Sequence, residues 1–403
     1  MGDARLRQLI ELALKNNRDL RVATLNIEQV RAQYQIRRAD QFPTLNLAAA
    51  GNRQSSGDDS ITSLYTAGLA MSGWEIDFFG RVASLKEVAL AQYLASEEAR
   101  NAAQTSLVAS VASTWLSLQA SDELLALTQR TLATRQDSLR LTKLRFDNGA
   151  TSALDLRQAE SLTAAAESAL AQQQRQRAQD LNALTLLVGQ PLPATLTDPA
   201  SDVVTARSLF RDLPAGLPSE LLTRRADIRQ AEQTLIAANA NIGAARAAFF
   251  PRISLTGSVG SASSELSGLF KGGSWGFTLA PQALLPIFDA GRNRAGLESA
   301  KVGRELAVAQ YEKAIQTAFR EVADALAGRA TLGEQLRAQQ VQATAEAERF
   351  RLAELRYRNG VASFLDVLDA QRSLFSTQQA LTQTRLAQQQ NQVALYKALG
   401  GGY

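Results

Sequence analysis

Two kinds of hydrophobic pattern alternate along this chain of 403 residues. In the proline-free runs 82–190 and 287–403, apolar residues recur at helical steps, as Leu125, Leu132 and Leu139 do. This spacing places them on one face of a helix, and the Ala, Leu, Gln, Glu and Arg between them favour helix as well. The pattern predicts helices at 4–40, 82–146, 153–188, 219–249, 294–357 and 363–398.

Each of the two long runs is interrupted by one Asn-Gly pair. The pairs are Asn148-Gly149, after Phe146-Asp147, and Asn359-Gly360, after Tyr357-Arg358. Both residue types tolerate the left-handed conformation that ends a helix and starts a tight turn. Each long run is therefore predicted to be a helical hairpin.

Between the helices lie four segments in which apolar and polar residues alternate with a period of two. They are 44–52, 65–75, 252–260 and 275–285, each apolar on one face and small or polar on the other. Such strands suit a membrane wall with one face in lipid and one in a wet lumen. A half-buried strand of a soluble sheet would give the same alternation, so these segments alone leave both interpretations open.

The chain reads as an internal duplication. Phe42-Pro43 recurs as Phe250-Pro251, and Gly80-Arg81 recurs as Gly291-Arg292. The turn motif at 144–155 recurs at 355–366. We therefore predict a first repeat at 1–188, a Pro-rich linker or equatorial segment at 189–218 and a second repeat at 219–403. Because four strands cannot close a barrel and lipid does not tolerate open edges, membrane-spanning strands would require several copies.

Composition removes several classes of chemistry. The chain contains no Cys and no His, which excludes disulfides, thiolate or imidazole metal sites and His-based catalytic triads. The formal net charge is +4, and the Arg residues are scattered, so no nucleic-acid footprint is visible. We expect no enzyme activity, no cofactor and no metal site. No apolar run approaches the roughly 18–20 residues of a spanning helix.

Five segments together resemble a known family. The sequence resembles the outer membrane factors, the TolC-like outer-membrane efflux proteins of Gram-negative tripartite multidrug pumps. It is most similar to the branch that serves resistance-nodulation-division (RND) transporters in pseudomonads. The segments are Trp74–Arg81, Gly216–Ile228, Ala244–Pro251, Tyr311–Phe319 and Leu368–Leu374.

The resemblance implies the fold and the partners. It implies an α+β membrane protein, a homotrimer in which four strands per chain contribute to a 12-stranded outer-membrane β-barrel, above a long periplasmic α-barrel. This exit duct would pass drugs and other small molecules, with a periplasmic membrane-fusion adaptor, an inner-membrane RND-type transporter and outer membrane lipid as partners. A type I protein-secretion duct of the same fold and a soluble coiled-coil scaffold are the alternatives.

The resemblance places the protein in the outer membrane with a long periplasmic extension. Mature chains of the family usually begin earlier, often at a lipidated cysteine. This chain starts inside the first predicted helix and has no cysteine. A signal peptide and a lipidated N-terminus are therefore absent from it, and we expect trimming. Ala226 replaces the proline that the family usually has after Arg-Arg.

The resemblance also assigns a gate at the periplasmic end of the duct. Residues that match the constriction are Leu365, Asp366, Asp369 and Arg372, with Tyr357 and Asp155 as further candidates. On a helix, 365, 369 and 372 share one face. Asp155 could equally be a helix-end aspartate that favours the helix dipole. An arginine that the family has after the tyrosine is here Ala362, so we expect a different closed-state network.

Two further groups of residues are predicted to be functional. The hairpin turns are the expected docking surface for the adaptor, although simple turn geometry would select the same residues, which are Asn148, Gly149, Ser152, Asn359, Gly360 and Ser363. Trp74 and Trp275 lie near strand ends, as membrane-interface aromatics do. Ordinary packing is the alternative for these two residues.

Overall fold

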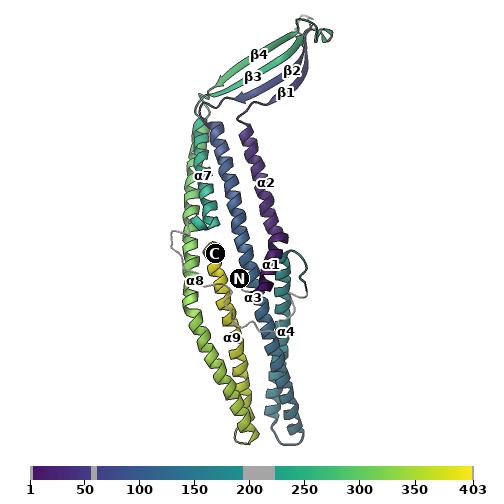
Figure 1. Cartoon of the computed structure of the whole chain (residues 1–403), viewed down its shortest axis with the longest axis vertical. Coiled ribbons are helices and arrows are strands. Elements are labelled where there is room, and N and C mark those ends of the chain that lie inside the picture. The colour runs from purple at the N-terminus through teal and green to yellow at the C-terminus, as the bar shows by residue number, and fades with distance from the viewer. Residues whose placement is uncertain (1–2, 56–60, 194–222, 402–403) are drawn as a thin grey trace. The chain divides into compact units, whose positions relative to one another are not determined.

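The computed structural model describes residues 3–55, 61–193 and 223–401. In these ranges the order helix, strand, strand, long helix, helix occurs twice (Figure 1). The helices are α1 (Ala4–Asn16), α2 (Arg18–Ala39), α3 (Arg81–Asp147), α4 (Ala153–Val188), α7 (Ala226–Ala247), α8 (Arg292–Arg358) and α9 (Phe364–Ala398), with a short 3-10 helix, η1 (Leu266–Gly268). The strands are β1 (Leu45–Ser55), β2 (Ile61–Glu75), β3 (Arg252–Ser263) and β4 (Trp275–Leu284). None of the described helices has an apolar segment long enough to cross a membrane.

The chain forms two compact units, which are described separately. One unit takes its described residues from Met1–Val22, Asn101–Ala226 and Ile315–Tyr403. The other takes them from Ala23–Arg100 and Asp227–Ala314. Of the predicted linker 189–218, only 189–193 lie within the described residues, and Gly216–Leu222 of the family segment lie outside them.

The helix predicted over 4–40 is wrong at Asn17, where α1 ends and α2 begins. The Asn17 backbone is extended. Its side-chain oxygen accepts from the amide of Leu20 at 2.9 Å, while its side-chain nitrogen donates to the carbonyl of Leu187 at 2.8 Å. A side chain that bonds to backbone groups in this way stabilises a helix end rather than a helix interior.

The helix predicted over 219–249 is also interrupted, because α7 begins only at Ala226. The preceding Arg225 is buried, and its guanidinium donates to Glu321 at 2.7 Å and to the carbonyl of Ala398 at 3.1 Å. A buried guanidinium requires such partners because an unpaired buried charge is costly. These contacts join the start of α7 to α8 and α9.

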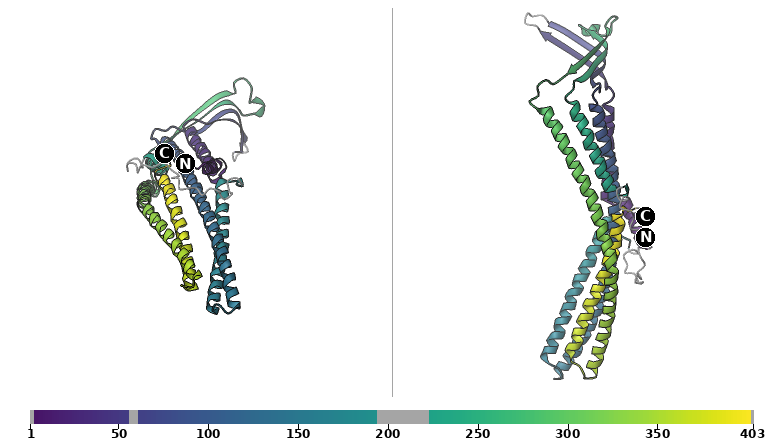
Figure 2. Two further views of the ribbon diagram at one scale, coloured as in Figure 1. Left: turned by 60° about the horizontal axis from the view of Figure 1, so that its bottom comes forward. Right: turned by 90° about the vertical axis from the view of Figure 1, so that its left-hand side faces the viewer.

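The first unit has a hydrophobic core to which α1, α3, α4, α8 and α9 contribute, together with Leu20 of α2. Its fully buried members include Leu6, Leu116, Leu184 and Val393. Burying such a side chain stabilises by about 1.5–3 kcal/mol. The paired helices of each hairpin lie side by side in both views of Figure 2. The hairpins predicted at the two Asn-Gly pairs are thus present, α3 with α4 and α8 with α9.

The second unit contains one antiparallel sheet with the order β1-β2-β3-β4. Pairing aligns Leu47, Leu69, Val259 and Phe277 in one row across the four strands. The neighbouring row, on the other face, consists of Asn46, Ala70, Ser258 and Thr278. One face is therefore apolar, and it is exposed, since Leu47 and Phe277 are 85% and 83% accessible.

Two facing glycines let the central strands approach closely. Gly68 of β2 pairs with Gly260 of β3. A Cβ on Gly68 would lie 2.3 Å from the carbonyl oxygen of Val259, and one on Gly260 would lie 2.3 Å from that of Ala67. Real Cβ atoms do not come this close to a backbone oxygen, so only glycine fits on either side.

We predict that Gly68→Ala or Gly260→Ala prevents normal folding of the sheet. The new methyl group would collide with backbone that is fixed by strand pairing, at a cost of about 1–3 kcal/mol or more. The yield of folded protein should fall roughly tenfold. Gly276→Ala is the matched control, because Gly276 pairs with Gly260 but has no atom within 4 Å of an added Cβ. Equal yields from all three variants would contradict this assignment.

Candidate functional site: the hairpin turns and the gate helix

The two hairpin turns have the same construction. Gly149 and Gly360 have φ of 70° and 72°. Their amides donate to the carbonyls of Phe146 at 2.9 Å and Tyr357 at 3.0 Å. The amide of each following residue donates to the carbonyl one residue further back, that of Arg145 at 2.7 Å and that of Arg356 at 2.9 Å. This is a helix C-terminus closed by a left-handed glycine.

The remaining turn residues bond to the backbone or cap the next helix. Asn148 and Asn359 donate to the carbonyls of Leu144 at 2.7 Å and Leu355 at 2.8 Å. Ser152 caps α4 in a capping box with Asp155, and Ser363 caps α9 with Asp366. Every predicted docking residue therefore has a structural role in the turn, which does not prevent a binding role for the exposed surface.

Asp155 and Asp366 are engaged by their own turns. The Ser152 hydroxyl, and after it the Thr151 hydroxyl, holds the pKa of the Asp155 carboxyl below its usual value. Asp366 accepts from the amide and hydroxyl of Ser363 at 3.1 and 3.0 Å. Both are acidic residues in the first turn of a helix, where the helix dipole favours negative charge.

One polar contact links the two hairpins near their turns. The guanidinium of Arg145, at the end of α3, donates to the hydroxyl of Tyr357 at the end of α8. It also lies over the tyrosine ring, 5.1 Å from its centroid, and that ring packs against Phe364 at 5.2 Å. Arg145 thus partners the tyrosine from the other hairpin, while position 362 is alanine.

The start of α9 has one exposed face and one buried face. Leu365 is half exposed, and Asp366 and Arg372 are exposed. Val367 and Leu368 of the same helix are buried with Ala159 of α4. The candidate gate residues therefore share a surface that a single chain leaves open.

Asp369 on this surface is bound to an arginine that sequence reasoning missed. Its carboxylate accepts from Arg349 of α8 at 2.6 Å, and Arg349 also binds Glu346 at 3.2 Å and Ser373 at 3.4 Å. Arg349 and Asp369 lie at nearly equal distances before and after the Asn359-Gly360 turn. Since antiparallel hairpins pair such positions, this spacing was a usable signal.

Arg135 connects the first hairpin to α9. It is only 5% exposed, donates to the carbonyl of Leu162 on α4 at 2.9 Å, and lies over the ring of Phe375 at 5.3 Å. Burial, and then the charge of Arg372, lowers the pKa of its guanidinium. No sequence signal indicated this contact, because it depends on how three helices pack.

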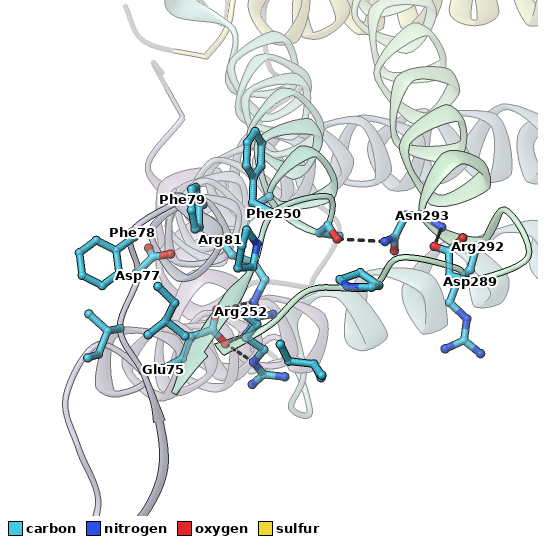
Figure 3. A pocket seen from close by; sticks show the side chains of 17 residues that line it. Glu75, Asp77, Phe78, Phe79, Arg81, Phe250, Arg252, Asp289, Arg292 and Asn293 are labelled. Carbon is cyan, nitrogen blue, oxygen red and sulfur yellow. Dashed lines mark hydrogen bonds and ion pairs between the residues drawn. The ribbon is translucent and has the colours of Figure 1, made fainter. Parts of the chain in front are cut away.

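In the second unit, the strand ends meet the helices around a cavity of about 320 Å³ (Figure 3). Glu75 binds Arg81 through both carboxylate oxygens at 2.8 and 2.6 Å, and Arg252 at 2.6 Å. Phe79 and Phe250 stack at 4.9 Å. These ion pairs and the ring stack connect the strand ends to the helices that follow them.

The two tryptophans of the strands, Trp74 and Trp275, lie on the apolar face of the sheet. Trp275 begins β4 and is 73% exposed. A bulge between Met71 and Trp74 places Trp74 opposite Leu255, and so on the same face as Val259. In the described part of the chain, the buried indole nitrogen of Trp74 has no hydrogen-bond partner. This placement suits interfacial aromatics, and that role stays a prediction.

Comparison with known proteins defines the class. The chain matches the outer membrane efflux protein family over residues 9–190 and 217–401. It is 50% identical to the probable efflux pump outer membrane protein TtgC of Pseudomonas putida, over all of this chain and 84% of TtgC. The chain therefore belongs to the outer membrane efflux protein family.

Solved structures agree with this class. A membrane protein of Pseudomonas aeruginosa is 48% identical, with a TM-score of 0.94, over all of this chain and 91% of the other. The open state of the outer membrane channel MtrE of Neisseria gonorrhoeae is 42% identical, with a TM-score of 0.87, over 99% and 89%. The predicted fold class, outer-membrane location and function as the exit duct of an efflux pump are confirmed.

We predict that Ser152→Ala and Ser363→Ala each loosen the first turn of the following helix. Loss of a serine cap costs about 0.5–2 kcal/mol. Hydrogen exchange at the amides of Asp155 and Asp366 should therefore accelerate roughly 2- to 30-fold. Ser161→Ala is the control, because Ser161 lies exposed in the interior of α4 and its replacement should leave exchange unchanged or slower.

The protection of α4 should also depend on pH. The pKa of the Asp155 carboxyl is lower in the folded protein than the reference value of 3.8 for the unfolded chain. The ionised carboxylate therefore contributes its full stabilisation of α4 at pH values above that unfolded pKa. This stabilisation is lost as pH falls through the folded pKa, below that value. Asp155→Asn should remove this dependence between neutral and acidic pH. An unchanged pH profile in Asp155→Asn would show that another group is responsible.

Proposed function

We propose that three copies of the chain close into one duct that carries small molecules out through the outer membrane. The observation that supports this most directly is the sheet. Among the described residues, the outer edges of β1 and β4 pair with no other strand, and one face is apolar and exposed. Lipid does not tolerate unpaired strand edges, so the edges must meet those of other copies, and three copies give 12 strands.

The internal repeat predicts how β4 of one copy pairs with β1 of the next. Leu45 of β1 and Ile253 of β3 occupy equivalent positions after the two Phe-Pro motifs. Their strand partners are Met71 and Ala283, which makes Met71 and Ala283 equivalent as well. The contact between β2 and β3 therefore serves as a template for β4 and the β1 of the next copy.

The template gives a specific register. Met71 pairs with Gly257 across the boundary between the repeats. The first-repeat equivalent of Gly257 is Ala49. By this reasoning, Ala283 of one copy pairs with Ala49 of the next, with both side chains on the apolar face.

The exposed face of α9 is the proposed gate. With three copies around one axis, Leu365 gives an apolar ring and Asp369, with Arg372, a charged ring. The link between Arg145 and Tyr357 joins neighbouring hairpins, so it favours the closed arrangement. We place the docking of a periplasmic adaptor, and through it an RND-type transporter, at the turns around Gly149 and Gly360, which no other described part of the chain covers.

We predict that a variant with Ala49→Cys and Ala283→Cys forms a covalent trimer on oxidation. Cα atoms of paired antiparallel residues lie about 4.5–5.5 Å apart, within the range that a disulfide spans. The chain has no cysteine of its own, so every cross-link reports the new pair. Non-reducing electrophoresis of the membrane-extracted protein gives the result.

Ala48→Cys with Ala283→Cys is the matched control, because a shift of one residue turns the side chain to the other face. It should cross-link poorly. Equal cross-linking of both pairs, or no covalent trimer from the first pair, would contradict the proposed assembly.

We predict that Tyr357→Phe makes the closed duct leakier. The change keeps the ring beside Phe364 and removes the hydroxyl that accepts from Arg145. An exposed bond of this kind is worth roughly 0.5–1 kcal/mol, so the open population should rise about two- to fivefold. Single-channel recording in a planar bilayer measures it. The same open probability in Tyr357→Phe and the parent would remove Tyr357 from the gate.

We predict that Gly149→Val or Gly360→Val lowers efflux while trimer yield stays normal. A β-branched residue is strained at φ of 70° or 72°, so the exposed turn changes shape. Drug accumulation in cells, measured alongside the cross-linked trimer, checks this. Gly272→Val is a control, because Gly272 has open space around it and lies between η1 and β4 in the other unit. Normal efflux in both turn variants would show that the turns are not the docking surface.

A further inference from the structure

The charge of the proposed gate is not carried by an isolated aspartate. Asp369 shares Arg349 with a second carboxylate, Glu346, so one guanidinium lies between two acids. Glu346 and Arg349 belong to α8 and Asp369 to α9. The group therefore bridges the two helices of one hairpin, close to the exposed face of α9.

The side chains are about half exposed, 47% for Arg349 and 50% for Asp369. Ion pairs in such a position contribute little to stability, typically 0–1 kcal/mol. The same charges still change the electrostatic potential around them, because a charge acts over the screening length of roughly 8–10 Å. An ion pair that adds little stability can therefore still determine the electric field in a narrow, water-filled passage.

We infer that Arg349 is a positioning residue that sets both the direction of the Asp369 carboxylate and the ion preference of the gate. The inference rests on the proposed function, in which this face of α9 lines the duct. Arg349 holds one oxygen of Asp369 through its Nη2 atom, which fixes where the remaining lone pairs point. It also neutralises one of the two negative charges that Glu346 and Asp369 carry.

The neighbouring Arg372 reduces the negative charge further. It lies one turn along α9 from Asp369 and is exposed, and in the described part of the chain it forms no ion pair. The parent duct should therefore prefer cations only modestly. Removal of Arg349 should strengthen the preference of the duct for cations.

The test compares four ducts whose gate charges differ by known steps. Arg349→Gln removes one positive charge per copy, Asp369→Asn removes one negative charge, and the double variant restores the parent's net charge. The measurement is the reversal potential of the membrane-extracted protein in a planar bilayer under a KCl gradient, together with block by a trivalent cation.

Arg349→Gln should raise the ratio of cation to anion permeability roughly three- to tenfold, as expected when a trimer loses three positive charges within a screening length. Block by the trivalent cation should strengthen in parallel. Asp369→Asn should shift both in the opposite direction, and the double variant should return to within about twofold of the parent. Arg349→Lys, which keeps the charge, should remain near the parent.

Arg351→Gln is the matched control. Arg351 lies on the same helix two residues further on, and within the described ranges its ion-pair partner is Glu348, at 2.6 and 2.8 Å, on an exposed surface. Its removal changes the total charge equally but should leave the reversal potential unchanged. Equal shifts in Arg351→Gln and Arg349→Gln would overturn the inference, as would a reversal potential that Arg349→Gln does not change.

The covalent trimer separates this inference from the proposed function. A cross-linked trimer that conducts while Arg349→Gln leaves ion preference unchanged would reject the role of Arg349 alone. Absence of both the trimer and conductance would reject the duct itself. Covalent trimer from each variant also shows that the substitution has not simply prevented folding.

Discussion

The open edges of the four-stranded sheet are the constraint on which the rest of the structure depends. Edge strands expose a row of unpaired amides and carbonyls, and an exposed apolar face adds a second unsatisfied surface. Neither is satisfied within one chain, since the described residues end the sheet at β1 and β4. The internal duplication offers a way to pair these edges. The contact between β2 and β3, which joins the two repeats inside one chain, can recur between β4 of one chain and β1 of the next.

The two junctions of the repeat are not equivalent, and this follows from sequence. Within the chain, Glu75 binds Arg81 and Arg252. In the second repeat, Pro286 occupies the position of Glu75, while Arg292 remains at that of Arg81. A joint between copies built on the same plan lacks that carboxylate. In the proposed trimer, three ion-paired junctions inside the chains would alternate with three junctions between chains that lack this carboxylate.

Periodicity predicted the elements well because it reflects local geometry. The strand predicted at 44–52 extends over Leu45–Ser55, and the helix predicted at 153–188 has those bounds. The break at Asn17 was missed because the carbonyl that holds its side chain belongs to Leu187, far along the chain. Of the candidate site, the turn residues followed from sequence, whereas the gate residues came from family resemblance. The contacts of Arg135 could not be predicted, since they lie on two other helices, α4 and α9.

Contacts within each turn are numerous, and the described polar contact between the turns is a single exposed one. Each helix end is closed by a left-handed glycine, an asparagine bond and a capping box. Between the turns, Arg145 and Tyr357 share one hydrogen bond. Separating the hairpins there breaks that bond and leaves both turns intact. Arg135 restrains α9 about three helical turns further from the hairpin tip, where its buried guanidinium gains water if α9 moves away. Near the tips, each turn can therefore move without losing its own shape, because the polar contact between the turns is weaker than the bonds that shape each one.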